Sequence, residues 1–256
     1  MRSKQTMLPL TELVKRRFGR GFRPVPGRDV YLASYPRSGN TWLRALAFVL
    51  EMDRMPTSLG EVDLYVPDLH YTAVRRKIRK RPRYVVKTHE IRRGEVGEAI
   101  YIVRDPVSVL GSYFRYVCQV ERRELELEAF ITDCLCGRVW PGSWSEHALS
   151  WCHPAHSGVS VIRYEDMTQH ADSAVEAFSA RLGHTPEKTR SALAMLDIDT
   201  MKRLDANGHR EYLNKQGGGW FVGSSTDADH KRAIRNLIER HRPETLELAA
   251  RFGYDV

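Results

Sequence analysis

The chain has 256 residues, 42% of them hydrophobic and 28% charged, and a formal net charge of +8. This composition is that of a globular protein with a sizeable core, and it excludes a disordered or fibrous chain. Because the sequence contains no apolar run of about 18 residues and its basic start lacks the apolar stretch of a signal peptide, we expect a cytoplasmic protein without stable membrane insertion.

Residues 1–28 are expected to form an N-terminal extension, and residues 29–256 a single domain of ordinary size. The extension contains the segment LPLTELVKRRF. This segment is short for a helix that lies in a membrane interface, so docking onto the domain is favoured over contact with lipid.

Short apolar runs predict four buried strands, at residues 29–34, 83–87, 98–103 and 158–163. Helical spacing of apolar residues predicts helices at residues 41–52 and 171–183, and further helices that open at Pro106 and Pro186. Asp105 and Thr185 are natural N-caps before these prolines, and Gly183 is a natural helix stop. Strands that alternate with helices predict an α/β fold, in which a parallel central sheet is flanked by helices.

From about Leu204 to Asp227 the chain is polar and rich in glycine, and two final helices are expected after it. A segment of this length inside a compact domain is more often a lid or a binding loop than a plain connection. It is therefore one of the regions where we expect a ligand to be contacted.

The positive charge is concentrated between residues 71 and 95, where ten basic residues stand against two acidic ones. Such a block can attract anionic ligands or steer nucleic acid. Its densest part, RRKIRKRPR at residues 75–83, is equally well interpreted as a solvated surface stretch.

The four cysteines are too few for a disulfide framework in a chain of this length. Cys134, Cys136, Cys152 and His156 can be read as a zinc site, but a Cys-x-Cys pair without a second paired motif does not fit the usual spacing of zinc ligands. Reduced, mostly buried thiols are the better interpretation, and we expect no metal.

The loop PRSGNT, between the first strand and the first helix, has the parts of an anion cradle. Gly39 permits a tight turn and a close approach of the backbone, and Ser38, Asn40 and Thr41 carry short polar side chains. Arg37 adds a fixed charge, and the helix N-terminus adds free N–H groups. The chain has neither a Walker GxxxxGK[ST] loop nor GxGxxG at this position, so an ordinary strand-to-helix turn remains the alternative.

Lys87 and His89 occur in VVKTHE, at the carboxyl end of a predicted strand, and the period of two places both on one side. A histidine there can take a proton from a hydroxyl near neutral pH, and a lysine beside it can stabilise developing negative charge. A lone histidine is more often structural, but this position beside an anion cradle favours catalysis.

Two further motifs follow in the chain. In VRDPVSVLGSY, Arg104 leaves a strand and Ser112 lies about two helical turns later, so both could reach one phosphate. The alternative is that Arg104 only pairs with Asp105. In RYEDM, Tyr164 follows a strand and could meet a base ring, as could Trp42.

In this order, SYPRSGNTW, KTH, VRDPVSVLGSY and RYEDM resemble the motifs of the cytosolic-type sulfotransferases, from about Val30 to Met167. These enzymes use 3'-phosphoadenosine 5'-phosphosulfate (PAPS). The resemblance implies the P-loop-like, PAPS-binding sulfotransferase fold. It also implies transfer of a sulfuryl group from PAPS, which leaves adenosine 3',5'-bisphosphate (PAP), without a metal.

The resemblance assigns donor-binding roles residue by residue. It implies that Ser38, Gly39, Asn40 and Thr41 hold the 5'-phosphate. Trp42 would pack on adenine with Tyr164 near the base. Arg104 and Ser112 would hold the 3'-phosphate. The C-terminal Arg-Lys-Gly element of the family is degenerate here, and the nearest equivalents are Lys215, Gln216 and Gly217 in NKQGGG.

The catalytic roles come from the resemblance in the same way. His89 would be the general base, and Lys87 would assist at the sulfonate. Arg37 stands where the family usually has a lysine that touches the leaving phosphate, a change that keeps the charge but alters its reach. Asn40 stands where threonine is common.

Two rival functions remain at this point. A kinase-like phosphoryl transferase would share the phosphate-binding physics, although the Walker lysine is missing. A nucleic-acid-binding module would use the basic stretch; we expect no nucleic-acid partner.

The predicted acceptor is a hydroxyl or amine of a small molecule, glycoside or natural product, and the basic window also suits an acidic sugar. Several aromatic side chains are either a pocket lining or core: Tyr65, Tyr71, Tyr113, Phe114, Trp140, Trp144 and Trp220.

Overall fold

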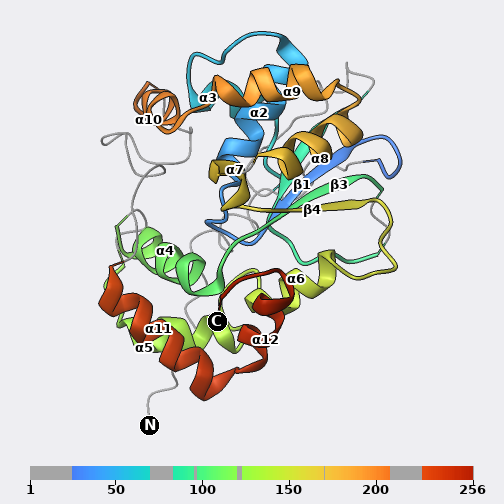
Figure 1. Ribbon diagram of the computed structural model, residues 1–256. Coiled ribbons are helices and arrows are strands. Elements are labelled where there is room, and N and C mark those ends of the chain that lie inside the picture. Colours follow the sequence, from blue (N-terminus) through green and yellow to red (C-terminus); the bar gives the residue numbers. More distant parts are fainter. Residues whose placement is uncertain are drawn as a thin grey trace.

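The computed structural model describes residues 25–69, 83–94, 97–119, 123–169, 171–207 and 227–255. Within them the strands are β1 (Val30–Ser34), β2 (Val85–Thr88), β3 (Ala99–Val103) and β4 (Val159–Arg163). They form one parallel sheet in the order β2-β1-β3-β4 (Figure 1). The predicted α/β class and all four predicted strands are confirmed, each within two residues of its expected bounds.

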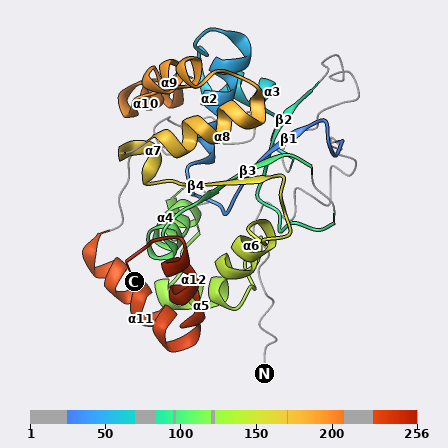
Figure 2. The same ribbon diagram turned by 45° about the vertical axis from the view of Figure 1, so that its right-hand side comes forward.

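The sheet is covered on both faces, which is why its strands are continuous apolar runs (Figure 2). β1 and β3 are buried along nearly their whole length. Along β1 the side chains alternate between two separate apolar clusters: Val30 and Leu32 belong to one, and Ala33 belongs to the other. The core therefore consists of two layers, with the sheet between them.

One helical layer covers the face of Val30 and Leu32 and lies above the sheet in Figure 1. It consists of α2 (Asn40–Met52), α3 (Leu59–Tyr65), α7 (Asp166–Gln169), α8 (Asp172–Leu182), α9 (Pro186–Ala194) and α10 (Ile198–Ala206). The other layer lies below the sheet and covers the face of Ala33. It consists of α4 (Pro106–Gln119), α5 (Leu127–Leu135), α6 (Trp144–Trp151), α11 (Ala228–His241) and α12 (Glu244–Arg251).

The expected helix boundaries are confirmed by their caps. The Asp105 carboxylate accepts hydrogen bonds from the backbone N–H groups of Val107 and Ser108. Thr185 caps α9, which opens with Pro186, and Gly183 ends α8 with a left-handed backbone, φ 69°. Short polar side chains and a residue without a Cβ occupy these positions because they satisfy the free backbone groups at helix ends.

The expected loop start at Leu204 is wrong, because α10 runs to Ala206 with Met201 and Leu204 buried on its inner face. Met201 and Leu204 form an apolar i, i+3 pair, but the mostly polar residues around them obscure this helical pattern in the sequence. The remainder of the glycine-rich segment, residues 208–226, lies outside the described residues, as do residues 1–24 and 70–82 of the extension and the basic window.

The strand order places the ligand-binding edge of the sheet. The chain leaves β1 toward β2 on one side and leaves β3 toward β4 on the other, so the connections diverge between β1 and β3. In open α/β sheets, the crevice at such a divergence, beyond the carboxyl ends of the strands, is where ligands bind. The loops that begin after Ser34 and after Val103 border this point.

All four cysteines are free thiols in the structure, and Cys136 alone among them is exposed. Among the described residues, no group of three or more His, Cys, Asp and Glu side chains is close enough to hold a metal ion. No helix of the described part of the chain is long and apolar enough to cross a membrane.

The thiols are expected to differ in reactivity. Burial raises the pKa of Cys152 to about 12 and raises that of Cys134 well above its usual value, so at pH 8 both are almost entirely protonated and unreactive. Alkylation with iodoacetamide at pH 8, followed by mass spectrometry, should modify Cys136 first and leave Cys134 and Cys152 unmodified. Raising the pH toward 12 should speed modification of Cys152.

Two controls complete this experiment. In denaturant all four thiols should react, and the substitution Cys136→Ser should remove the fast reaction of the folded protein. Modification of Cys152 at the rate of Cys136 in the folded protein would contradict the burial described here.

Candidate active site

The loop between β1 and α2 has the backbone of an anion cradle. Gly39, the N-cap of α2, has φ 92°, and Arg37 has φ 69°, a conformation that side chains with a Cβ adopt rarely. The loop leads directly into the N-terminus of α2, where an α-helix leaves its first N–H groups without intrahelical partners; here the Trp42 N–H donates to the Gly39 carbonyl at 3.0 Å. Ser38 is fully buried, and its Oγ has no hydrogen-bond partner among the described residues.

Asn40, the first residue of α2, turns its side chain toward the sheet. Its Nδ2 donates to the Leu32 carbonyl at 3.0 Å and to Ser34 Oγ at 3.1 Å. The amide therefore ties the helix N-terminus to the end of β1. Its backbone N–H remains the group of Asn40 that is best placed for a bound anion.

The first loop and the motif after β3 lie against each other. Arg104 Nη1 donates to the Arg37 carbonyl at 2.9 Å, and Arg37 Nε donates to Ser112 Oγ at 3.3 Å. The Arg37 guanidinium also lies 5.1 Å from the centre of the Tyr116 ring. The structure thus brings together three residues that the sequence assigns to two different phosphate contacts.

Tyr164, which follows β4, lies against both the first loop and Arg104. Its backbone N–H donates to the Val103 carbonyl at 2.8 Å, which continues the β3–β4 pairing past the strand end. The guanidinium of Arg104 lies 4.2 Å from the centre of the Tyr164 ring. A Cβ added to Gly39 would come within 2.4 Å of Tyr164 Cδ2, so glycine is required where the loop touches the ring.

Trp42 and Thr41 occupy the first turn of α2. Trp42 is partly buried and packs against the cluster that contains Leu32. Its Nε1 is buried without a hydrogen-bond partner in the described part of the chain. The Trp42 ring is therefore held by the core cluster, and its Nε1–H is a hydrogen-bond donor near the loop.

His89 directly follows β2 and is 8% exposed. Its Nδ1 lies 2.7 Å from the Ser34 carbonyl oxygen and 3.3 Å from Ser34 Oγ. Because a carbonyl oxygen only accepts hydrogen bonds, Nδ1 carries a hydrogen, and in the neutral ring Nε2 carries the lone pair. The end of β1 thereby fixes the tautomer that a general base requires.

Two neighbours hold His89 from the other layer. His147 is fully buried; its Nε2 donates to the His89 carbonyl at 3.1 Å, so its Nδ1 accepts from the hydroxyl of Tyr101 at 3.0 Å. Trp140 stands edge-on to the His89 ring, with 5.9 Å between ring centres. His89 is thus fixed both through its ring and through its backbone.

Lys87, the third residue of β2, is buried and pairs with Asp68, with 2.6 Å between Nζ and Oδ2. The sequence predicted the place of Lys87 at the strand end but gave no signal for its partner. Asp68 lies 19 residues earlier, in a segment without strand patterning, and only the fold brings it alongside.

Arg115 is a second residue that the sequence reasoning missed. It lies one helical turn after Ser112 on α4, and burial and then the positive charge of Arg104 lower its pKa. The i, i+3 spacing from Ser112 was the signal that could have found it. Arg104 and Arg115 are therefore close enough to repel each other.

The other predicted residues divide as follows. Lys215, Gln216 and Gly217 lie outside the described residues, as do Tyr71 and Trp220. Tyr113 and Trp144 are buried in the lower core cluster; Tyr65 and Phe114 are partly buried against the two clusters. Among these aromatics, Trp140 is the side chain that the structure places against His89.

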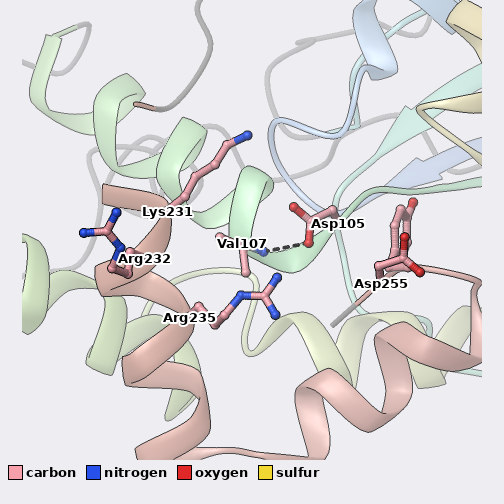
Figure 3. A pocket seen from close by; sticks show the side chains of 7 residues that line it. Asp105, Val107, Lys231, Arg232, Arg235 and Asp255 are labelled. Carbon is pink, nitrogen blue, oxygen red and sulfur yellow. Dashed lines mark hydrogen bonds between the residues drawn. The ribbon is translucent and has the colours of Figure 1, made fainter. Parts of the chain in front are cut away.

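A separate cavity of about 320 Å³ adjoins the start of α4. Figure 3 shows the side chains of Lys231, Arg232 and Arg235, from α11, on one side of it, with Asp105 and Asp255 across from them. The Asp105 carboxylate is already engaged as the cap of α4. Arg232 pairs with Asp229. The cavity thus carries charges of both signs and is distinct from the buried donors of Ser38 and Arg104.

The fold and site define an α/β protein that presents a cationic loop, built like an anion cradle, and a fixed histidine at the divergence point of a parallel sheet. Comparison with known sequences identifies the family. The sequence model of the Sulfotransferase domain matches residues 27–241, and the chain belongs to that family.

Individual relatives are distant. The chain is 26% identical to human "Sulfotransferase 4A1" in an alignment of length 183 that covers 65% of this chain and 64% of that protein's length. It is 27% identical to "Flavonol 3-sulfotransferase" of Flaveria bidentis in an alignment of length 207 that covers 70% of this chain and 66% of that protein.

Solved structures give the same fold. A crystal structure of retinol dehydratase in complex with androsterone and the inactive cofactor PAP superposes with a TM-score of 0.63. The superposition covers 85% of this chain and 81% of that chain at 16% identity. At this identity the likeness establishes the fold.

The contact between Gly39 and Tyr164 predicts that alanine is more destabilising at position 39 than at position 183. Gly39→Ala and Gly183→Ala both introduce a Cβ at positive φ, which costs about 1–2 kcal/mol, but a Cβ at Gly183 meets nothing within 4 Å. The clash with Tyr164 should lower the free energy of unfolding of Gly39→Ala by a further 1–3 kcal/mol or so. Urea unfolding followed by circular dichroism measures both; equal losses would contradict the contact.

Proposed function

We propose that this protein is a PAPS-dependent sulfotransferase that moves a sulfuryl group to a hydroxyl or amine, with His89 as the general base. The observation that carries the proposal is the geometry of His89: its Nδ1–H is held by the Ser34 carbonyl at 2.7 Å, next to the anion-binding loop. Membership of the Sulfotransferase domain family supports the same activity.

The residues present fit an adenosine bisphosphate group. Several buried donor atoms have no hydrogen-bond partner among the described residues, and three of them lie in or beside the two motifs: Ser38 Oγ, Trp42 Nε1 and Arg104 Nε. A buried donor without a partner is costly, so an anionic ligand that accepts from such atoms would be favoured. In this proposal Ser38, Gly39, Asn40 and Thr41 bind the 5'-phosphate.

The remaining donor contacts follow the same division. Arg104 and Ser112, with Arg115 one turn away, would hold the 3'-phosphate. Tyr164 and Trp42 would bracket the base. We propose that Lys215, Gln216 and Gly217 close over the donor, within the single domain 29–256.

In the reaction, PAPS when bound supplies an activated sulfuryl group, whose bond to phosphate oxygen breaks as the bond to the acceptor forms. His89 Nε2 takes the proton of the acceptor hydroxyl, and its Nδ1–H stays on the Ser34 carbonyl. Lys87, Arg37 and the N–H groups of α2 stabilise negative charge on the sulfonate and on the departing phosphate. Positioning and electrostatics supply most of the acceleration, and no residue here requires a metal.

The proposed acceptor is a small molecule, a glycoside or a natural product. Trp140, edge-on to His89, gives the acceptor side an apolar wall suited to a ring system. The names of similar proteins point the same way: one is a flavonol sulfotransferase, and another is seen with androsterone. We propose that the protein has no nucleic-acid partner.

The donor can be identified by ligand-induced stabilisation. At a hundred times its dissociation constant, PAP should stabilise the protein by about 2.7 kcal/mol, or roughly 5–10 °C in melting temperature. ATP and NAD at equal concentration should give much smaller shifts, because neither carries a 3'-phosphate for Arg104 and Ser112. A larger shift with ATP, dependent on Mg²⁺, would favour a phosphoryl transferase instead.

The role of His89 is tested by substitution. His89→Ala should lower turnover by about a hundredfold or more, because a positioned general base is lost. Its affinity for PAP, measured by calorimetry, should stay near that of the unaltered protein. His241→Ala, at an exposed position, is the matched control and should leave turnover unchanged. Near-normal turnover of His89→Ala would remove His89 from the role.

A further inference from the structure

The ion pair between Lys87 and Asp68 has both of its side chains buried. Its atoms are 2.6 Å apart, and its side chains are 5% and 2% exposed. Ion pairs at this depth are rare because both charges lose their hydration. The pair therefore requires an explanation beyond chance contact.

The backbone places the carboxylate. Residues Pro67 to Leu69 run along β2 as a short parallel addition to the sheet: Lys87 N–H donates to the Pro67 carbonyl at 2.8 Å, and Leu69 N–H donates to the Lys87 carbonyl at 3.0 Å. Asp68 and Lys87 are the bridged pair of this addition. Residues paired in this way direct their side chains to the same side, so Asp68 is aimed at the Lys87 ammonium by register.

The segment that carries Asp68 is also held by a second buried charge, that of Arg44. Arg44 of α2 is fully buried; its Nε donates to the Val66 carbonyl at 3.1 Å, and its Nη1 pairs with Asp63 of α3 at 2.5 Å. Because α2 begins at the anion-binding loop, the same helix that presents the loop also holds the segment carrying Asp68. The carboxylate thus has little freedom to move away from Lys87.

Burial alone does not explain why the pair is present. Replacing a buried ion pair by apolar side chains of similar volume is often neutral or stabilising, so such a pair is weak evidence for stability. An ammonium has three hydrogen-bond donors, and a carboxylate that takes one of them sets the direction of the others. A neighbouring carboxylate also favours the protonated form of an amine.

We propose that Asp68 is a positioning residue that holds the Lys87 ammonium protonated and directed toward the sulfonate during transfer. The inference rests on the proposed function, in which Lys87 stabilises that group. Asp68 touches neither donor nor acceptor and acts through Lys87. Its negative charge weakens attraction of the donor in the ground state, so its benefit lies in turnover and not in binding.

The test is a double-mutant cycle of Asp68→Asn and Lys87→Met in the full chain. Asparagine keeps the shape of Asp68 and can still accept from the ammonium but removes the charge. Asp68→Asn should lower kcat tenfold or more, leave KM for PAPS unchanged or lower, and keep the dissociation constant of PAP within twofold. In the Lys87→Met background, the same substitution should change kcat by less than twofold, while Asp68→Glu alone should restore most of the kcat lost in Asp68→Asn.

Asp29→Asn is the matched control. Asp29 is also a buried carboxylate, but it accepts from the Tyr84 and Val25 N–H groups at the amino end of the sheet. This variant should melt at a lower temperature with kcat within twofold of the unaltered protein. If Asp68→Asn behaves like Asp29→Asn, with lower stability and unchanged kcat, Asp68 is structural and the proposal is overturned.

The remaining outcomes separate the two levels of inference. Independent, multiplicative losses from Asp68→Asn and Lys87→Met would overturn the proposal while leaving the proposed function intact. If Asp68→Asn does not fold, the double variant Asp68→Asn/Lys87→Met, which removes both charges, is compared with Lys87→Met. Equal kcat values of these two variants support the proposal. A kcat of the double variant that is tenfold lower than that of Lys87→Met overturns it. Failure of the unaltered protein to transfer from PAPS would overturn the proposed function itself, and the role of Asp68 with it.

Discussion

Leu32 of β1 pairs with Lys87 on one side and with Ile100 on the other, and the positions of the site's side chains follow from this parallel register. It brings the end of β2 beside the end of β1, so that the Ser34 carbonyl meets the ring of His89. It also brings the end of β3 beside the loop after β1, so that Arg104 reaches the Arg37 carbonyl. A slip of one residue would turn each of these side chains to the opposite face.

The charge distribution of the site is prepared for an anion. Arg37 donates to Ser112, Arg104 donates to the Arg37 carbonyl, and the pKa of Arg115 is lowered by burial and then by the charge of Arg104. The charge of Asp227 acts on Arg115 in the opposite direction to that of Arg104, and an anion bound beside the two guanidinium groups would reduce the repulsion between them. In the proposed function, donor binding and folding stability would be linked through the same residues. At the end of β2 the balance is different, because the charge of Lys87 is matched by Asp68.

Much of the fold could be predicted because its signals are local. The buried strands are uninterrupted apolar runs, and Asp105, Thr185 and Gly183 mark helix ends by their own chemistry. The start of the loop after α10 was misplaced because the charged residues Arg203 and Asp205 flank Leu204 in its last turn, and burial of one side chain is decided by distant partners.

The site was predictable where it is carried by contiguous motifs, and less so where it depends on contacts between segments. The loop at Ser38 and Gly39 and the strand end at His89 could be found in the sequence, although their roles remain predictions. The pairing of Asp68 with Lys87 and the support of His89 by His147 could not be found, because no local pattern links residues 19 or 58 positions apart.

The left-handed backbone of Arg37, φ 69°, has a chemical consequence of its own. An L-residue pays about 1 kcal/mol or more for this conformation, whereas glycine would relax the turn and lose the guanidinium. D-arginine would find its own preferred region at this φ, but inversion exchanges Hα and Cβ, so its guanidinium would leave Ser112 and the Tyr116 ring. The handedness of this one residue therefore sets the direction of its cation, and the strained L-enantiomer is the form that meets both neighbours.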